Sequence, residues 1–77
     1  MTAKEEQVMP LSMVKIGELN CIKRVNGKEE VCRLLKNLGF VAGSNVMVVS
    51  VTGGSVIVNV KDSRVAISRE MANKIMV

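Results

Sequence analysis

The feature that most constrains this chain is a helix, a glycine stop, a tight turn and a strand that follow one another without spare residues. They occupy residues 33–49, RLLKNLGFVAGSNVMVV. The preceding residues extend the pattern, and a helix is predicted over residues 28–38 because its apolar side chains recur at i, i+3, i+4 and i+7: Val31, Leu34, Leu35 and Leu38. Gly39 follows as the left-handed residue that commonly ends a helix. Such compression suits a small β-barrel whose helix covers one end.

Alternating apolar residues and turn signals predict the remaining elements. A first strand is expected over residues 18–25, before the Asn26-Gly27 turn. Residues 45–51 and 55–60 should form a hairpin through two glycines, Gly53 and Gly54. A strand over residues 64–67 should lead into a short helix over residues 69–73 capped by Ser68, and residues 75–77 should return as a closing strand.

Near the N-terminus, Pro10 should open one helical turn that Ser12 caps and that stops before Gly17. Residues 1–9 are charged and patternless, which predicts a flexible tail, and residues 10–77 then form one domain. The predicted fold class is mainly β with short helices: a small SH3-like β-barrel with a helix inserted after the first strand.

The core should be built from aliphatic side chains, because Phe40 is the only aromatic residue among 77. Its predicted members are Ile22, Val31, Leu34, Leu35, Leu38, Val46, Val48, Val56, Val58, Val65 and Ile67. If Leu34 is buried, its replacement by alanine should cost about 2–5 kcal/mol.

Composition excludes several kinds of chemistry. The sequence has no histidine, which removes Ser-His-Asp and Cys-His catalysis and the commonest transition-metal ligand. Cys21 and Cys32 match no zinc-binding spacing and are expected to act as small buried apolar residues rather than as a disulfide. The glycines form no phosphate-binding loop. We therefore expect no enzyme, no cofactor and no metal site within one chain.

The net charge of +4 leaves the kind of partner open. The eleven bases are dispersed, which is typical of a solvated surface, and a single phenylalanine offers little for stacking nucleic-acid bases. No apolar run approaches the length of a membrane span, and the first residues lack a secretory pattern. A cytoplasmic location is expected.

Three blocks in the right order resemble the FeoA family, the small cytoplasmic proteins of bacterial ferrous iron uptake. They are Pro10-Leu11-Ser12 with Gly17, residues 33–43 with the Leu38-Gly39-Phe40-Val41 turn, and residues 64–70, RVAISRE. Where the family usually has Val-Pro-Gly, this chain has Val41-Ala42-Gly43. The resemblance implies the SH3-like barrel and a non-enzymatic accessory role toward the membrane transporter FeoB. It brings no metal site, because the residues for one are missing.

Two alternatives stay open beside this resemblance. One is a small basic nucleic-acid-binding β-barrel. The other is a stand-alone relative of the C-terminal domain of DtxR-type metal-dependent repressors, in which FeoA-like domains also occur.

The partner surface is expected around the end of the helix, at Arg33, Lys36, Phe40 and Val41. An apolar pair in a surface turn is either packed down as a plug or presented as an anchor, and both roles remain open for Phe40. Lys36 and Arg33 would favour an acidic partner. Weak self-association is also compatible with such a surface.

Overall fold

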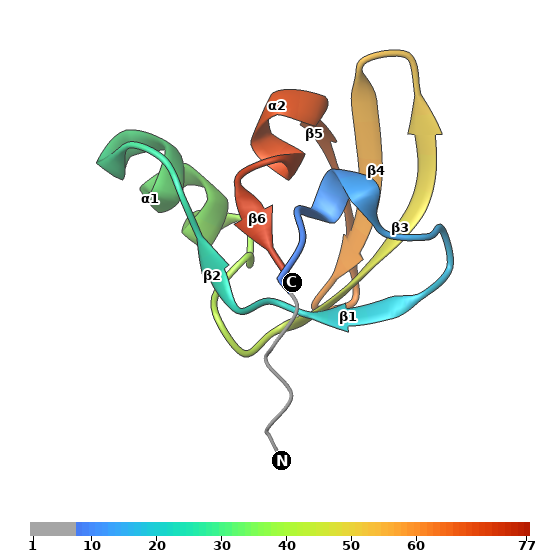
Figure 1. Cartoon of the computed structure of the whole chain (residues 1–77). Coiled ribbons are helices and arrows are strands. Elements are labelled where there is room, and N and C mark those ends of the chain that lie inside the picture. The colour runs from blue at the N-terminus through green and yellow to red at the C-terminus, as the bar shows by residue number, and fades with distance from the viewer. Residues whose placement is uncertain (1–7) are drawn as a thin grey trace.

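The computed structural model describes residues 8–77 (Figure 1). Strands dominate and the helices are short, so the predicted fold class is confirmed in this respect. In chain order the elements are the 3-10 turn η1 (Leu11–Met13), strands β1 (Leu19–Cys21) and β2 (Arg24–Val25), helix α1 (Glu29–Asn37), strands β3 (Asn45–Thr52), β4 (Ser55–Val60) and β5 (Ser63–Ser68), helix α2 (Arg69–Ala72), and strand β6 (Ile75–Met76).

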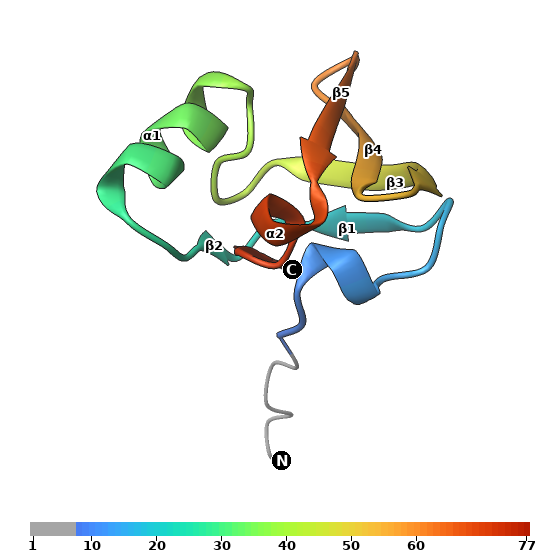
Figure 2. The ribbon, with the colours of Figure 1, turned by 90° about the horizontal axis from the view of Figure 1, so that it is seen from above.

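Within the described residues the strands form a four-stranded antiparallel sheet, in the order β1-β3-β4-β5, and a two-stranded sheet of β2 and β6. Tight turns make β3, β4 and β5 a meander (Figure 2). Gly53 has a φ of 55° in the first turn, and Lys61 and Asp62 both have positive φ in the second. Such two-residue turns with left-handed residues match the twist of paired strands. The predicted hairpin is confirmed.

The prediction of one strand over residues 18–25 is wrong, because the chain changes sheet in the middle. β1 pairs with β3, whereas β2 pairs with β6. Between them the amide of Ile22 donates to the Ser44 carbonyl at 2.9 Å, and that of Lys23 donates to the Met76 carbonyl at 2.7 Å. Both halves are extended, so alternation along the sequence does not reveal where the partner strand changes.

The N-terminal turn also differs from its prediction. Pro10 is its N-cap, and Ser12 instead donates from its hydroxyl to the side-chain oxygen of Asn73, just beyond α2. The turn ends at Met13, so it stops before Gly17 as predicted. Ser12 therefore links the two ends of the described chain rather than capping a helix.

The predicted tail lies largely outside the described residues. Where the description begins, Met9 exchanges two backbone hydrogen bonds with Val77, of 3.0 and 2.9 Å, and Pro10 bridges to Met76. Residues 9 and 10 thus lie alongside the C-terminal end of the chain, paired with Val77 and Met76.

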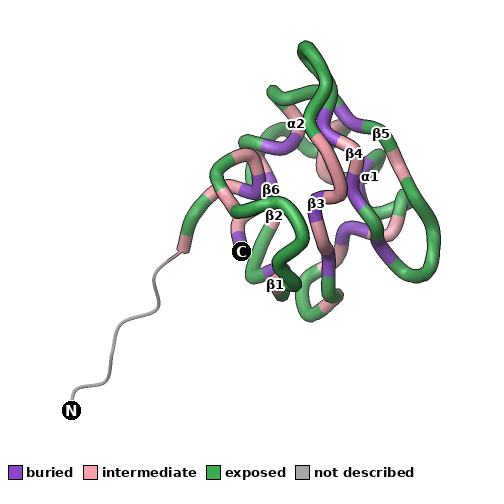
Figure 3. Tube along the Cα trace, turned by 90° about the vertical axis from the view of Figure 1, so that its right-hand side faces the viewer, coloured by how far each residue is buried: buried purple, intermediate pink, exposed green. Residues whose placement is uncertain are grey.

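The core lies under the inner face of the larger sheet and includes Leu11 of η1, Ala72 of α2 and Ile75 of β6. Figure 3 shows the buried residues in purple along the chain. Seven predicted members are buried: Ile22, Leu35, Val46, Val48, Val56, Val58 and Ile67. Val31 and Val65 pack against the core while half-buried. The prediction is wrong for Leu34 and Leu38, which are exposed. Six further buried residues were not on the predicted core list: Leu11, Phe40, Val60, Ala72, Ile75 and Val77. For Phe40, burial is one of the two roles that the sequence left open.

Candidate partner-binding site

Helix α1 ends in a specific backbone motif that fixes the following turn. Leu38 is the C-cap, and Gly39 has a φ of 107°. The amide of Gly39 donates to the Lys36 carbonyl at 3.0 Å, and that of Phe40 donates to the Leu35 carbonyl at 2.9 Å. These are the two bonds of a Schellman motif, which needs a left-handed residue after the C-cap. The predicted glycine stop is confirmed.

Phe40 packs downward from this turn into the core. Its residue surface is only 1% exposed, and it is the largest fully buried side chain in the described chain. Its position is that of a plug at the α1 end of the core. The ring therefore supports the surface above it from beneath.

The next residues of the turn are held at both ends. The amide of Gly43 donates to the Ile22 carbonyl at 2.8 Å, and that of Ser44 donates to the Val41 carbonyl at 3.0 Å. Val41 is half-buried and Ala42 is exposed. Backbone hydrogen bonds therefore close this turn although position 42 is an alanine and not a proline.

A groove of ≈ 330 Å³ lies between α1 and β2, and we call it the α1–β2 groove. Lys36, Phe40 and Val41, three of the four predicted partner residues, contribute to its lining. The remaining lining comes from residues that prediction missed: Lys23, Arg24, Val25, Cys32 and Ala42. In the sequence, the adjacent bases Lys23 and Arg24 could have indicated a basic surface. Their position beside α1 depends on the pairing of β2 with β6, which the sequence does not reveal.

Arg33 is not among the residues that line the groove. Its guanidinium lies 3.5 Å from the Glu29 carboxylate, one helical turn earlier, and both side chains are largely exposed. Exposed pairs of this type contribute little to stability, about 0.3–0.5 kcal/mol. Arg33 is therefore not brought together with the other three predicted residues in the groove lining.

The two cysteines are free and have different environments. Cys21 is exposed, so the expectation of a small buried residue is wrong there, since it faces outward from edge strand β1. Cys32 is half-buried, and its sulfur lies 3.6 Å from each of the carbonyl oxygens of Val25 and Gly27. These weak contacts hold the first turn of α1 against the end of β2. Within residues 8–77, no three acidic or cysteine side chains are grouped to hold a metal ion.

A second hollow, of ≈ 440 Å³, has a different character. It lies beside the outer face of the larger sheet, where Leu19, Met47 and Asn59 occupy one row across three strands. Lys61 and Asp62 bring one charge of each sign to its lining. With one charge of each sign and a lining that is about equally polar and apolar, this hollow has no evident ligand preference.

Comparison with known proteins gives the class of this chain. Residues 9–77 match the model of the FeoA domain. The chain is 35% identical over 68 residues to an Fe(2+) transport protein A of Methanocaldococcus jannaschii, covering 88% of this chain and 83% of the relative. The chain belongs to the FeoA domain family and is a non-enzymatic accessory protein associated with ferrous iron transport.

Solved structures agree with this assignment. An iron uptake regulatory protein, FeoA, superimposes with a TM-score of 0.84 and 25% identity, covering 92% of this chain and 96% of the other. The FeoA of Stenotrophomonas maltophilia, solved with zinc and described as a procaryotic SH3 domain protein, gives a TM-score of 0.76 and 27% identity, with coverages of 87% and 86%. The predicted SH3-like fold is thereby confirmed. In the described part of the chain, α1 and α2 are both too short to span a membrane.

Proposed function

We propose that this chain is a cytoplasmic accessory protein of ferrous iron uptake that binds the cytosolic part of a FeoB-type transporter. The observation that carries the proposal is the FeoA match over residues 9–77. The α1–β2 groove supports it, because it combines apolar and basic groups on a surface whose backbone is fixed. The surface comprises Lys36 and Val41, with Arg33 on the same helix as Lys36 and Phe40 beneath.

The role of the chain is one of protein contact, and ferrous iron is the cargo of the partner. Ferrous ions favour imidazole and carboxylate ligands. The chain has no histidine, and the acidic and cysteine residues of its described part are too dispersed to chelate an ion. Anaerobic calorimetry should show no stoichiometric micromolar binding of Fe²⁺ by the monomer.

The rival function is binding of nucleic acid by a small basic barrel. Single-strand binders stack bases on exposed aromatic rings between basic residues. Here the only aromatic ring belongs to Phe40, which lies in the core. The surface therefore has basic residues that could contact phosphates, but no exposed aromatic ring on which nucleic-acid bases could stack.

A binding assay with the detergent-purified FeoB-type transporter of the same organism tests the proposal. The full chain should retain the transporter, and it should not retain a transporter variant that lacks its cytosolic domain. In parallel, a single-stranded and a duplex oligonucleotide are titrated at low and high salt, because affinity through several phosphate contacts falls steeply with salt. Tight, salt-sensitive oligonucleotide binding together with no retention of the transporter would favour the rival.

A further inference from the structure

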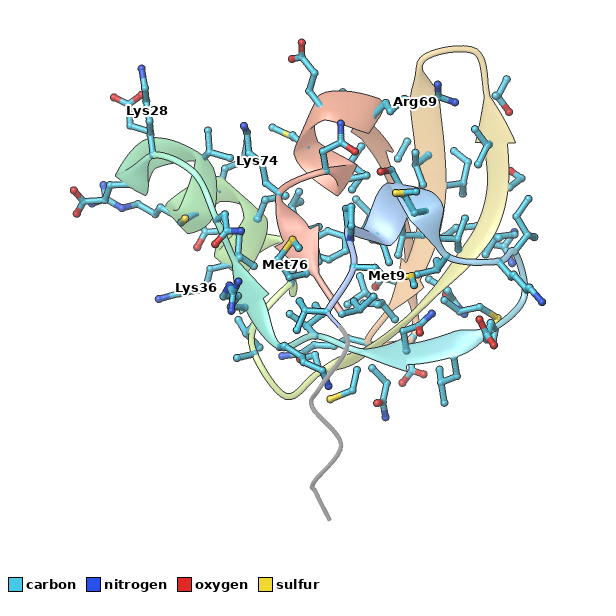
Figure 4. The ribbon with its side chains drawn as sticks, viewed as in Figure 1. Met9, Lys28, Lys36, Arg69, Lys74 and Met76 are labelled. Carbon is cyan, nitrogen blue, oxygen red and sulfur yellow. The ribbon has the colours of Figure 1, made fainter. Side chains whose placement is uncertain are left out.

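The α1–β2 groove has charge of one sign only. Lys23 and Arg24 line it from the β2 side, Lys36 lines it from α1, and its described lining contains no acidic residue. Figure 4 shows Lys36 extending outward from α1 beside β2, while Lys28 and Lys74 lie toward the other end of the helix. Glu29, the acidic residue that pairs with a base on α1, is two helical turns away from Lys36 and is engaged by Arg33. The groove is thus a local positive site on a chain that is only mildly basic overall.

Between these charges the lining is apolar and held in place. Val25 and Val41 are half-buried on facing segments, and Phe40 supports them from the core. The volume of ≈ 330 Å³ is at the lower end of the roughly 300–1,000 Å³ of ligand pockets. It fits an aliphatic side chain of a peptide better than a cofactor. Because the turn is closed by hydrogen bonds, little ordering is needed on binding.

The backbone of the groove restricts how a partner chain binds. The Val25 carbonyl is contacted by the Cys32 thiol, and the other edge of β2 is paired with β6. An incoming strand therefore cannot pair regularly along β2. The groove must therefore bind a partner through its side chains. Its basic residues lie on the rim and its apolar residues in the centre, as in a typical protein interface.

We infer that the α1–β2 groove binds an acidic segment of the transporter's cytosolic part, which inserts one aliphatic side chain between Val25 and Val41. Carboxylates of this segment pair with Lys23, Arg24 and Lys36. The inference rests on the proposed function. It adds the chemical character of the partner segment and the residues of this chain that bind it. Rim charges act mainly on the association rate and on its salt dependence.

Charge reversal tests this inference with the detergent-purified transporter immobilised and the full chain in solution. Arg24→Glu and Lys36→Glu should each weaken binding about tenfold, mostly through slower association, and should reduce its dependence on salt. Arg64→Glu is the matched control, since Arg64 is exposed on β5 and does not line the groove. It should change the affinity less than about threefold. Circular dichroism verifies that the variants are folded.

A Val41→Asp variant separates the apolar contact from the charges, and it should also weaken binding about tenfold or more without loss of fold. If the wild-type chain binds the transporter and both groove reversals match Arg64→Glu, the inference is overturned while the proposed function stands. If the wild-type chain does not bind the transporter, the proposed function fails and the inference fails with it.

Discussion

Leu35 and Leu34 are neighbours on α1, yet the structure assigns them very different roles. Leu35 is 0% exposed and is the buried residue of this helix, whereas Leu34 is 45% exposed. A fully buried Leu→Ala change costs about 2–5 kcal/mol, because it loses transfer free energy and leaves a cavity. For Leu34 about half of the side chain is already in water. At about 0.8 kcal/mol per buried CH₂ group, the loss of three carbons should cost only about 1 kcal/mol.

Urea unfolding followed by far-ultraviolet circular dichroism measures this difference, because the chain has no tryptophan or tyrosine for fluorescence. With an m-value of about 1 kcal/mol per molar for a domain this small, Leu35→Ala should lower the midpoint by about 2 M or more and Leu34→Ala by about 1 M. Leu38→Ala, at the exposed C-cap of the same helix, is a second reference.

A domain of this size is expected to have only about 5 kcal/mol of stability, so Leu35→Ala is at risk of being unfolded without denaturant. In that case Leu35→Val and Leu34→Val provide a milder pair with the same expected order. Equal midpoint shifts for the two positions would refute the reasoning, since they would mean that α1 buries both leucines to the same extent in solution.

Three further predictions concern the turns and the core, and the same unfolding assay measures each. Ser68→Ala should cost about 1 kcal/mol, because the Ser68 hydroxyl caps α2 by accepting from the Met71 amide at 3.1 Å. Gly39→Ala should cost more than about 1 kcal/mol through its φ of 107°, whereas Gly54→Ala, in open space and without positive φ, should be nearly neutral. Phe40→Ala should cost about 3–5 kcal/mol and leave little folded protein. Unchanged stability in Ser68→Ala, Gly39→Ala or Phe40→Ala contradicts the role given to that residue.

Local signals explain what the sequence predicts well. The end of α1 follows from Gly39, because a left-handed glycine at this position is dictated by the backbone itself. The β3–β4 hairpin follows from two glycines and from alternation in β4, whose valines at 56, 58 and 60 all point inward. In both cases the determining residues are neighbours in the sequence.

The missed features depend on contacts between distant residues. The break in the first strand arises because Ile22 pairs with Ser44 while Lys23 pairs with Met76. The burial of Ile75 and Val77 likewise depends on the N-terminal residues that lie along β6. Periodicity reveals that a segment has an apolar face, but not which segment covers it.

The same limit explains the error on α1. Its stripe of apolar side chains is real, but α1 lies at one side of the molecule, away from the main sheet (Figures 1 and 2). Only the part of the stripe at Leu35 and Val31 packs against the core. The apolar stripe therefore contains more side chains than this helix actually buries.

The candidate site combines both kinds of information. Lys36, Phe40 and Val41 are close in the sequence, and the structure keeps them together. Lys23 and Arg24 join them only because β2 pairs with β6 beside α1. Since Phe40 is in the core, its removal should impair binding through unfolding, whereas Lys36→Glu changes only the charge of the rim. A binding defect in Lys36→Glu at wild-type stability is therefore the sharper evidence for the site. It distinguishes a role of Lys36 in binding from the structural role of Phe40 in the core.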